Sequence, residues 1–572
     1  MSNNSNNSDP QVAALTNLFI SVLQSAKSTG QLTSIEVKKI EFSRTKNREH
    51  GDFATNIALN LAKENSQTPK NVAELLLKIL NATDFEKTKL EIGINKFEVA
   101  GPGFINIFLQ QGSRGQVINQ IISAGTKYGS GNSMQGSRIN LEFVSANPTG
   151  PLHLGHTRWA AVGDGLARTL KAAGATVSSE FYINDRGNQM DLFAESLLNA
   201  AKNQPVPEDG YNGEYIKDLA KIIVKKNPKI TSLKDAEAIS AFRSAGYELQ
   251  LQEQKEVLNN FRTKFDTWFS EESLYQDNFV DKVIEKYRSK GKVFSEEGAT
   301  WLRTTEFGDD KDRVLVKSDG AYAYFASDIA YYTSKRERGF NLCIYLLGAD
   351  HHGYVARLKA AAGCAGDNPE SSVKVLIGQM VKIMEGGQEL KLSKRAGTII
   401  TLAELVEKVG VDAARYTLMR YPTDTPMVLD VDLLKKHTND NPVYYVQYAH
   451  ARICAVLRNA TELKVNTLSA PIKDDFLNLL VHEREIDLLS ALAKFPEVVA
   501  TSAQLLQPHR ICRYLEELAG VYHRFYNDCR VLPMGEEKVG EIHRIRVTLC
   551  LATAQVIKNG LNLIGVEAPE RM

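Results

Sequence analysis

The chain has 572 residues and a mass of 63.5 kDa, which is too long for one compact core and predicts two to four domains. Hydrophobic residues make up 43% and charged residues 24%, which is ordinary for a soluble globular protein. The formal net charge is +1, so any nucleic-acid ligand must be bound by local basic patches and not by overall charge.

We expect no targeting segment and no metal-binding or redox cysteine motif in this chain. Residues 1–8 are polar and uncharged, unlike a secretory signal or a typical transit peptide. No run of about eighteen apolar residues occurs, so we expect no membrane span. The six cysteines form no CxxC pair and no Cys/His cluster with zinc spacing. Free thiols in a reducing compartment, and therefore a cytoplasmic location, are the expectation.

The first part of the chain predicts a small α+β domain at residues 10–112, after a disordered tail at 1–9. Apolar residues at helical spacing predict helices at 10–30, 53–63 and 71–80. Residues 97–107 indicate strand, Gly-Pro-Gly turn and strand. A Gly- and Ser-rich stretch follows, so residues 113–137 are predicted to be a linker.

Residues 138–405 predict an α/β domain with a doubly wound, Rossmann-like parallel sheet. Strand patterns at 139–143, 177–183 and 342–347 alternate with helical segments such as 154–173. A helical insertion is expected at about 190–300. From 406 to 572 the pattern indicates an all-α helix bundle, with long amphipathic stretches at about 442–460, 476–494, 509–527 and 541–560.

The segment Asn147–His156 carries the clearest chemical signal. It places His153 and His156 three residues apart at the start of a predicted helix, directly after a predicted strand. The N–H groups and dipole of a helix N-terminus add positive potential, and Gly155 lets a flat group such as an adenine approach the backbone. This suits binding of a nucleotide and stabilisation of a phosphate. A satisfied histidine pair or a metal-ligand pair remains the alternative.

A second segment, Lys391–Gly397, contains two lysines three residues apart and an arginine. It follows a predicted strand at 380–384 and a Gly-Gly turn. Such a loop can close on a triphosphate and neutralise the leaving pyrophosphate. The alternative is a solvated basic loop, which is the usual explanation for an isolated charge run.

Together the two segments resemble the HIGH and KMSKS signatures of class I aminoacyl-tRNA synthetases. Leu154, Leu392 and Arg395 depart from the consensus letters. The flanking segments resemble the arginyl family over nearly the whole chain, from about residue 10 to the last: 142–147, 182–189, 348–354, the N-terminal 51–56, the DALR-like 410–415 and the ending 569–572.

The resemblance implies the site residues. The catalytic residues would be His153, His156, Lys391 and Lys394. ATP would be bound by these four together with Pro148, Gly150, Gly155, Gly348, Asp350, His351 and Ser393. Arginine would be bound by Glu142, Ser145, Asn147, His156, Tyr324, Asp328 and His352. Tyr324 would pack on the guanidinium and Asp328 would pair with it, since residues four apart share a helix face.

The resemblance also implies the partners. A monomeric enzyme would bind L-arginine, Mg-ATP and tRNA-Arg, with no protein-bound structural metal, and the C-terminal bundle would read the anticodon loop. Two other functions remain open from the residues alone. One is a small HxGH nucleotidylyltransferase, which would need neither terminal domain. The other is a non-catalytic tRNA-binding relative, which would not need both histidines and both lysines.

Overall fold

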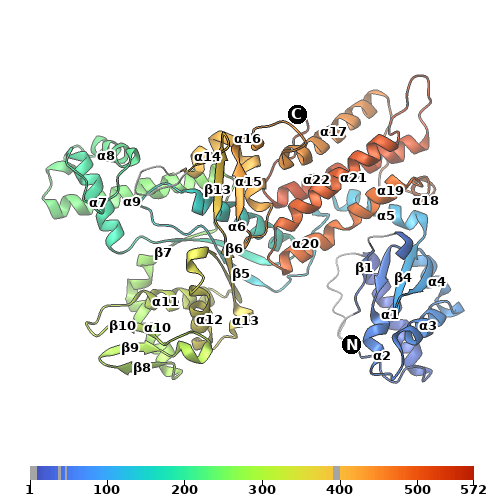
Figure 1. The fold of residues 1–572 in the computed structure, drawn as a ribbon, viewed down its shortest axis with the longest axis horizontal. Coiled ribbons are helices and arrows are strands. Elements are labelled where there is room, and N and C mark those ends of the chain that lie inside the picture. The colour runs from blue at the N-terminus through green and yellow to red at the C-terminus, as the bar shows by residue number, and fades with distance from the viewer. Residues whose placement is uncertain (1–9, 37–39, 46–47, 391–399) are drawn as a thin grey trace.

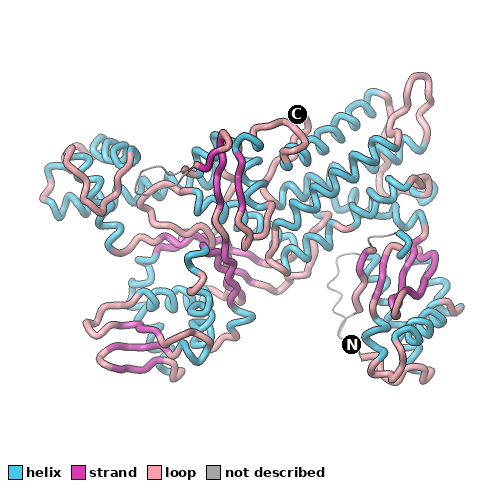
Figure 2. The backbone as a smooth tube through the Cα atoms, in the orientation of Figure 1, coloured by secondary structure: helices cyan, strands magenta, loops and turns pink. Residues whose placement is uncertain are grey.

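The computed structural model describes residues 10–36, 40–45, 48–390 and 400–572. An N-terminal domain, a central parallel sheet with a projecting helical arm, and a long helical bundle follow one another along the chain (Figure 1). Helices and strands are mixed in the first two parts, whereas the last is helical (Figure 2). The expected tail at 1–9 and three predicted site residues, Lys391, Ser393 and Lys394, lie outside the described residues.

The N-terminal domain packs helices on an antiparallel sheet of order β1-β2-β4-β3. The predicted hairpin is present, since Phe97 pairs with Ile107 across β3 and β4. The helix predicted at 53–63 begins only at Ile57, because 53–55 pair with β4. The elements are α1 (Pro10–Ser28), β1 (Ser43–Arg44), β2 (Phe53–Thr55), α2 (Ile57–Ala62), α3 (Pro69–Leu80), α4 (Thr83–Ile92), β3 (Ile94–Ala100) and β4 (Phe104–Leu109).

The first half of the linker predicted at 113–137 is a helix. Residues Gln111–Ala124 form helix α5, whose apolar face joins the main hydrophobic core. The Ile472 N–H donates to Asn119 Oδ1 at 2.7 Å, and the Tyr128 hydroxyl donates to the Leu492 carbonyl at 3.1 Å. A Cβ at Gly115 would lie 2.9 Å from that of Leu477, so this glycine allows the helix to dock closely. The packing of the regularly spaced apolar residues therefore makes this segment a helix, although its glycines had suggested a linker.

The central sheet is parallel, as predicted, with order β12-β11-β5-β6-β7. Its chain order reverses between β5 and β11, so the carboxyl ends of these two strands form the topological switch point where doubly wound sheets bind ligands. The strands are β5 (Arg138–Glu142), β6 (Thr176–Ile183), β7 (Thr267–Ser270), β11 (Leu342–Gly348) and β12 (Val373–Gly378), and the helices are α6 (Leu154–Ala172), α11 (Tyr324–Glu337), α12 (Tyr354–Cys364) and α13 (Pro369–Ser372).

The insertion expected to be helical at about 190–300 is mostly helical, but it also contains strands. Its first three helices form a separate arm with its own core (Figure 1). The chain then returns to the sheet as β7, a strand of four residues. It pairs with β6, which is distant in sequence and comes beside it only when the chain folds. A small antiparallel sheet of order β10-β9-β8 follows. The elements are α7 (Asn188–Ala201), α8 (Glu214–Lys226), α9 (Asp235–Asn260), α10 (Phe279–Ser289), β8 (Val293–Glu296), β9 (Ala299–Leu302) and β10 (Arg313–Val316).

The domain boundary predicted at 405/406 is too early. Strand β15 (Met427–Asp430) pairs in parallel with β13 (Val381–Glu385) in a separate three-stranded sheet, so strands continue past residue 406. The capping box at Thr401 is confirmed, since its hydroxyl accepts from the Glu404 N–H at 3.1 Å. The remaining elements here are β14 (Gln388–Glu389), α14 (Leu402–Val409), α15 (Val411–Met419) and α16 (Val431–Leu434).

The C-terminal region is the predicted helix bundle, and it shares one continuous hydrophobic core with the central sheet. Across the described ranges, no helix is both long enough and apolar enough to cross a membrane. The bundle helices are α17 (Pro442–Glu462), α18 (Asp474–Leu477), α19 (Glu483–Ala493), α20 (Phe495–Gln504), α21 (His509–Asp528) and α22 (Glu541–Leu563).

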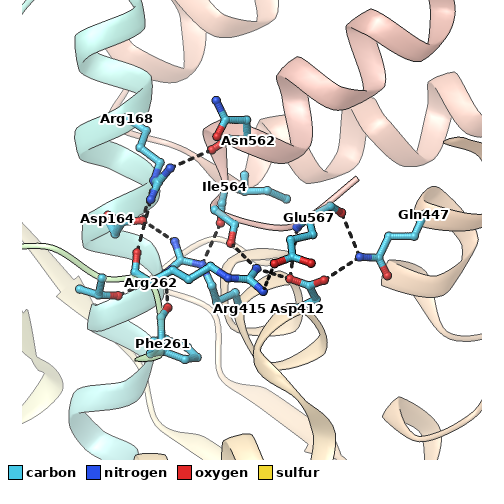
Figure 3. Close-up of polar contacts among 12 residues, drawn as sticks. Asp164, Arg168, Phe261, Arg262, Asp412, Arg415, Gln447, Asn562, Ile564 and Glu567 are labelled. Atoms are coloured by element: carbon cyan, nitrogen blue, oxygen red, sulfur yellow. Dashed lines mark hydrogen bonds and ion pairs between the residues drawn. The ribbon is translucent and has the colours of Figure 1, made fainter. Parts of the chain in front are cut away.

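A buried arginine in the 410–415 motif ties these regions together (Figure 3). The Arg415 side chain has no exposed surface, and its Nη2 pairs with Asp164 on α6. It also donates to the carbonyls of Phe261 at 2.8 Å and Ile564 at 3.1 Å. Three segments distant in sequence, from α6, the end of α9 and the end of α22, therefore meet at one guanidinium.

Candidate active site

The chain leaves β5 in an uncommon conformation. Val144 and Ser145 have φ angles of 70° and 36°, which L-residues other than glycine adopt rarely and which often mark functional sites. The Ser145 hydroxyl donates to Glu142 Oε1 at 3.2 Å and accepts from the Tyr182 N–H at 3.2 Å. The turn is therefore held across the carboxyl ends of β5 and β6, with Glu142 at its base.

The two histidines lie where this turn enters α6. His153 is the N-cap residue, and its Nδ1 accepts from the Gly155 N–H at 3.2 Å. His156 Nδ1 accepts from the His153 N–H at 3.4 Å, and the two ring centres are 4.1 Å apart. An imidazole that accepts at Nδ1 carries its proton on Nε2. Both side chains therefore have an Nε2–H donor at a helix N-terminus, which suits a phosphate.

The segment after the lysine motif lies against the histidine motif. The Leu154 N–H donates to the Ile400 carbonyl at 3.2 Å, and the Leu402 N–H donates to the Leu152 carbonyl at 2.8 Å. Ile400 and Leu402 follow directly on the residues that contain Lys391, Ser393 and Lys394, which lie outside the described part. The described end of that segment is thus anchored at the start of α6.

Strand β11 delivers the second set of predicted residues to the same edge of the sheet. Tyr345 is opposite Glu142 in the register of β11 with β5, so the strand ends are neighbours. Asp350 and His351 lie in a 3₁₀ turn at Ala349–His351, where Asp350 Oδ2 is 3.4 Å from His351 Nε2. His352 follows and is also exposed. Among the described residues, no group of three or more His, Cys, Asp or Glu side chains is placed to hold a metal ion.

A cluster of carboxylates faces this edge from α11 and from the turn after β7. Burial, together with the nearby Glu271 and Glu142, raises the pKa of Asp328 to about 7, although the hydrogen bond from the Tyr354 hydroxyl opposes this shift. Burial, with Asp185 nearby, also raises the pKa of Glu271. Carboxylates crowded in this way attract a cation with several donors, such as a guanidinium.

Other predicted residues fall around this centre. The Asn147 amide donates to the Asn184 carbonyl at 3.2 Å, next to Pro148 in the turn. The Gly150 carbonyl accepts from the Gln254 amide at 2.9 Å, which ties the turn to α9. Tyr324 begins α11, one turn before Asp328 as predicted, but its side chain is 92% exposed and is not packed over the carboxylates.

Sequence reasoning missed three side chains of this site: Glu271, Lys335 and Tyr354. Glu271 follows a four-residue strand that was not predicted, so no pattern marked it. Tyr354 is the last residue of the 348–354 segment that resembles the family, but it was given no role. Lys335, whose Nζ donates to Glu142 Oε2 at 2.6 Å, lies two helical turns after Asp328. This spacing was the one signal in the sequence that could have placed it on the same helix face.

Comparisons with known proteins cover all three regions. Family profiles match residues 13–109 as "Arginyl tRNA synthetase N terminal domain", 117–453 as "tRNA synthetases class I (R), catalytic domain" and 446–572 as "DALR anticodon binding domain". The catalytic profile ends at 453 and the anticodon-binding profile begins at 446, which is later than the boundary predicted at 405/406.

Solved structures agree with the family profiles. A Campylobacter jejuni structure assigned as an arginyl-tRNA synthetase is 32% identical, covers 81% of this chain and all of its own, and superposes with a TM-score of 0.73. The Thermus thermophilus arginyl-tRNA synthetase is 20% identical over 98% of this chain and 99% of its own, with a TM-score of 0.72, and shows the shared fold. With its catalytic profile spanning more than half of its length, the chain belongs to the arginyl-tRNA synthetase family of class I aminoacyl-tRNA synthetases.

Proposed function

We propose that arginine and ATP react at the carboxyl ends of β5 and β11. The family carries out ATP-dependent ligation of arginine to tRNA, and this chain has all three domains of that ligase. The observation that supports this location is that two unlike subsites both adjoin the end of β5: Glu142 acts on Asp328 electrostatically, and the turn after Glu142 leads to the histidines at the start of α6. Two Nε2–H donors at a helix N-terminus suit phosphate, and a carboxylate cluster around Asp328 suits a guanidinium.

In the first step, the arginine carboxylate attacks the α-phosphorus of ATP, and pyrophosphate leaves with the electron pair of the broken P–O bond. His153 and His156 donate to the oxygens that gain charge, and Lys391 and Lys394 hold the pyrophosphate. Magnesium arrives on the ATP phosphates. In the second step, the 2′-hydroxyl of the terminal adenosine of tRNA-Arg attacks the adenylate and releases AMP. Positioning and electrostatics carry the rate in both steps.

The remaining predicted residues keep their proposed roles around these steps. Pro148, Gly150 and Gly155 would line the adenine side of the turn, with Gly348, Asp350, His351 and Ser393 completing the ATP site. Glu142, Ser145, Asn147 and His352 would bind arginine together with His156 and Asp328. Tyr324 would close over the guanidinium from its exposed position, which requires its side chain to move on binding.

Substitution Asp328→Asn tests this location. We expect the KM for arginine to rise by about tenfold to a hundredfold, because a charge-assisted hydrogen bond is lost. The KM for ATP should stay within about twofold of the wild-type value. Asparagine can still accept from the Tyr354 hydroxyl, so the fold is preserved. Equal increases in the two constants would place the guanidinium elsewhere.

The raised pKa of Asp328 adds a pH signature to the same experiment. The carboxyl must be ionised to pair with a guanidinium, and its pKa is about 7. Arginine affinity should therefore be greatest above that pH and fall as the pH is lowered through it, towards about tenfold per pH unit. The Asp328→Asn variant should lose this dependence. An unchanged pH profile in the variant would assign the titration to another group.

The C-terminal bundle offers an aromatic and basic strip for the anticodon loop. Tyr444 stacks on Tyr448 with ring centres 5.9 Å apart, and Arg452 lies 4.4 Å from the ring centre of Tyr526. These side chains are half-buried, whereas Tyr522 is fully buried and belongs to the core. Unpaired bases stack on such rings and their phosphates pair with guanidinium groups. We assign anticodon binding to this strip.

Point variants test this assignment, because deletion of the bundle would expose the core that it shares with the sheet. Tyr448→Ala should weaken tRNA-Arg binding by about fivefold to a hundredfold, since one stacking partner is removed. Tyr448→Phe keeps the ring and is the matched control. Arg452→Gln should reduce the salt dependence of the dissociation constant, whereas Tyr448→Ala should not. Filter binding at several salt concentrations measures the dissociation constant and its salt dependence. Wild-type affinity for tRNA-Arg in Tyr448→Ala would exclude base stacking on this ring.

We also propose a cytoplasmic location and a monomeric state. All six cysteines are free and five of them are buried, as in a reducing compartment. One chain supplies the HIGH segment, the carboxylate cluster and the anticodon strip, which supports the proposal of a monomer.

A further inference from the structure

A buried lysine lies directly behind the proposed arginine site. The Lys335 side chain, on α11, has no exposed surface. Its Nζ donates to Glu142 Oε2 at 2.6 Å. The same ammonium lies 4.1 Å from the ring centre of Tyr331 and 3.9 Å from that of Tyr345. Glu142 is therefore its ion-pair partner, and two aromatic faces enclose the rest of the charge.

One stripe of α11 carries both the proposed substrate ligand and this lysine. Asp328 and Lys335 are separated by two helical turns and share a face. Tyr345 is opposite Glu142 in the sheet register, so the ammonium reaches Glu142 between α11 and the sheet. The Ser145 hydroxyl holds the other carboxylate oxygen at 3.2 Å. Glu142 is thus fixed at both oxygens, each of which keeps a lone pair for a further donor.

Stability alone gives no reason for a lysine at this position. Burial of an ammonium is costly even when it is paired, and well-packed apolar replacements of buried ion pairs are often neutral or stabilising. Glu180, the neighbouring buried carboxylate, is already held by Arg338 Nη2 at 2.9 Å and by the Tyr331 hydroxyl at 2.5 Å. Lys335 acts on Glu180 through electrostatics, but its hydrogen bond goes to Glu142, a side chain of the proposed arginine site.

We infer that Lys335 is a positioning residue for arginine recognition. Its ammonium fixes the Glu142 carboxylate so that the free lone pairs face a cationic group of the amino acid. Lys335 itself touches no substrate and acts through Glu142. This inference rests on the proposed function, because it takes Glu142 as part of the arginine site.

Four variants of the full-length enzyme test the inference: Lys335→Met, Lys335→Arg, Glu142→Gln and the double variant Glu142→Gln/Lys335→Met. Aminoacylation of tRNA-Arg gives the KM for arginine, the KM for ATP and kcat of each. Lys335→Met should raise the KM for arginine by about tenfold or more and leave the KM for ATP within about twofold. Lys335→Arg keeps a donor for Glu142 and should recover most of this loss.

The double variant separates positioning from a general structural effect. If Lys335 acts through Glu142, adding Lys335→Met to Glu142→Gln should change the KM for arginine by less than about twofold, because the carboxylate is already gone. The double variant also leaves no unpaired buried charge, so it remains informative if Lys335→Met alone does not fold. The inference would be overturned if the effects of the two substitutions on the KM for arginine were fully additive. It would also be overturned if the KM for ATP rose as much as the KM for arginine.

The proposed function can fail separately. If the wild-type protein does not charge tRNA with arginine, the function is wrong whatever Lys335 does. If it does so and Lys335→Met has wild-type constants, only the role of Lys335 is wrong.

Discussion

Substitution His156→Ala is expected to lower tRNA-dependent ATP–pyrophosphate exchange by about a hundredfold or more. The loss of one preorganised donor to a transition-state oxygen has effects of about this size. The His156 Nε2–H would serve charge that develops only in the transition state, so the KM values for ATP and arginine should change by less than about threefold. His156 also accepts from the His153 N–H, so its removal takes one cap contact from α6.

A control therefore has to separate the loss of the helix-cap contact from the loss of the catalytic donor. His156→Asn retains a side-chain acceptor for the His153 N–H and a donor amide. It should unfold at the wild-type temperature and recover part of the exchange rate. Unchanged exchange in His156→Ala, measured with saturating tRNA, would remove His156 from the catalytic residues.

The second large effect concerns stability. Arg415→Met is expected to lower the free energy of unfolding by about 3–5 kcal/mol, the usual cost of breaking a buried ion pair from one side. The change leaves Asp164 with Arg168 as its remaining arginine partner, and removes donors from the carbonyls of Phe261 and Ile564 (Figure 3). Because α6 begins at the two histidines, aminoacylation should also fall.

The matched control is Arg168→Met, which removes the other, partly exposed arginine from Asp164. Partly exposed pairs contribute about 1 kcal/mol or less, so its unfolding midpoint in urea should be close to that of the wild type. The comparison requires reversible unfolding, because a protein of several domains need not be two-state. Equal midpoints for Arg415→Met and the wild type would show that this contact does not hold the regions together.

The sequence by itself determined the features that depend on neighbouring residues. Local residue spacing was sufficient to predict the strand, turn and helix around His153 and His156. It also predicted the capping box at Thr401 and the long amphipathic helices of the bundle. Their order along the chain was sufficient to predict a doubly wound sheet between two other domains. The family resemblance rested on the same short segments.

Tertiary structure decided everything that depends on distant partners. Strand β7 exists because β6 lies beside it, and α5 is a docked helix because the bundle covers its apolar face. Lys335 reaches Glu142 across 193 positions of sequence, and the pKa of Asp328 is raised by burial and by carboxylates from other elements. Pattern analysis detects periodicity within a segment. Electrostatics and packing act through space, so the charges of the proposed arginine site could be placed only in the folded chain.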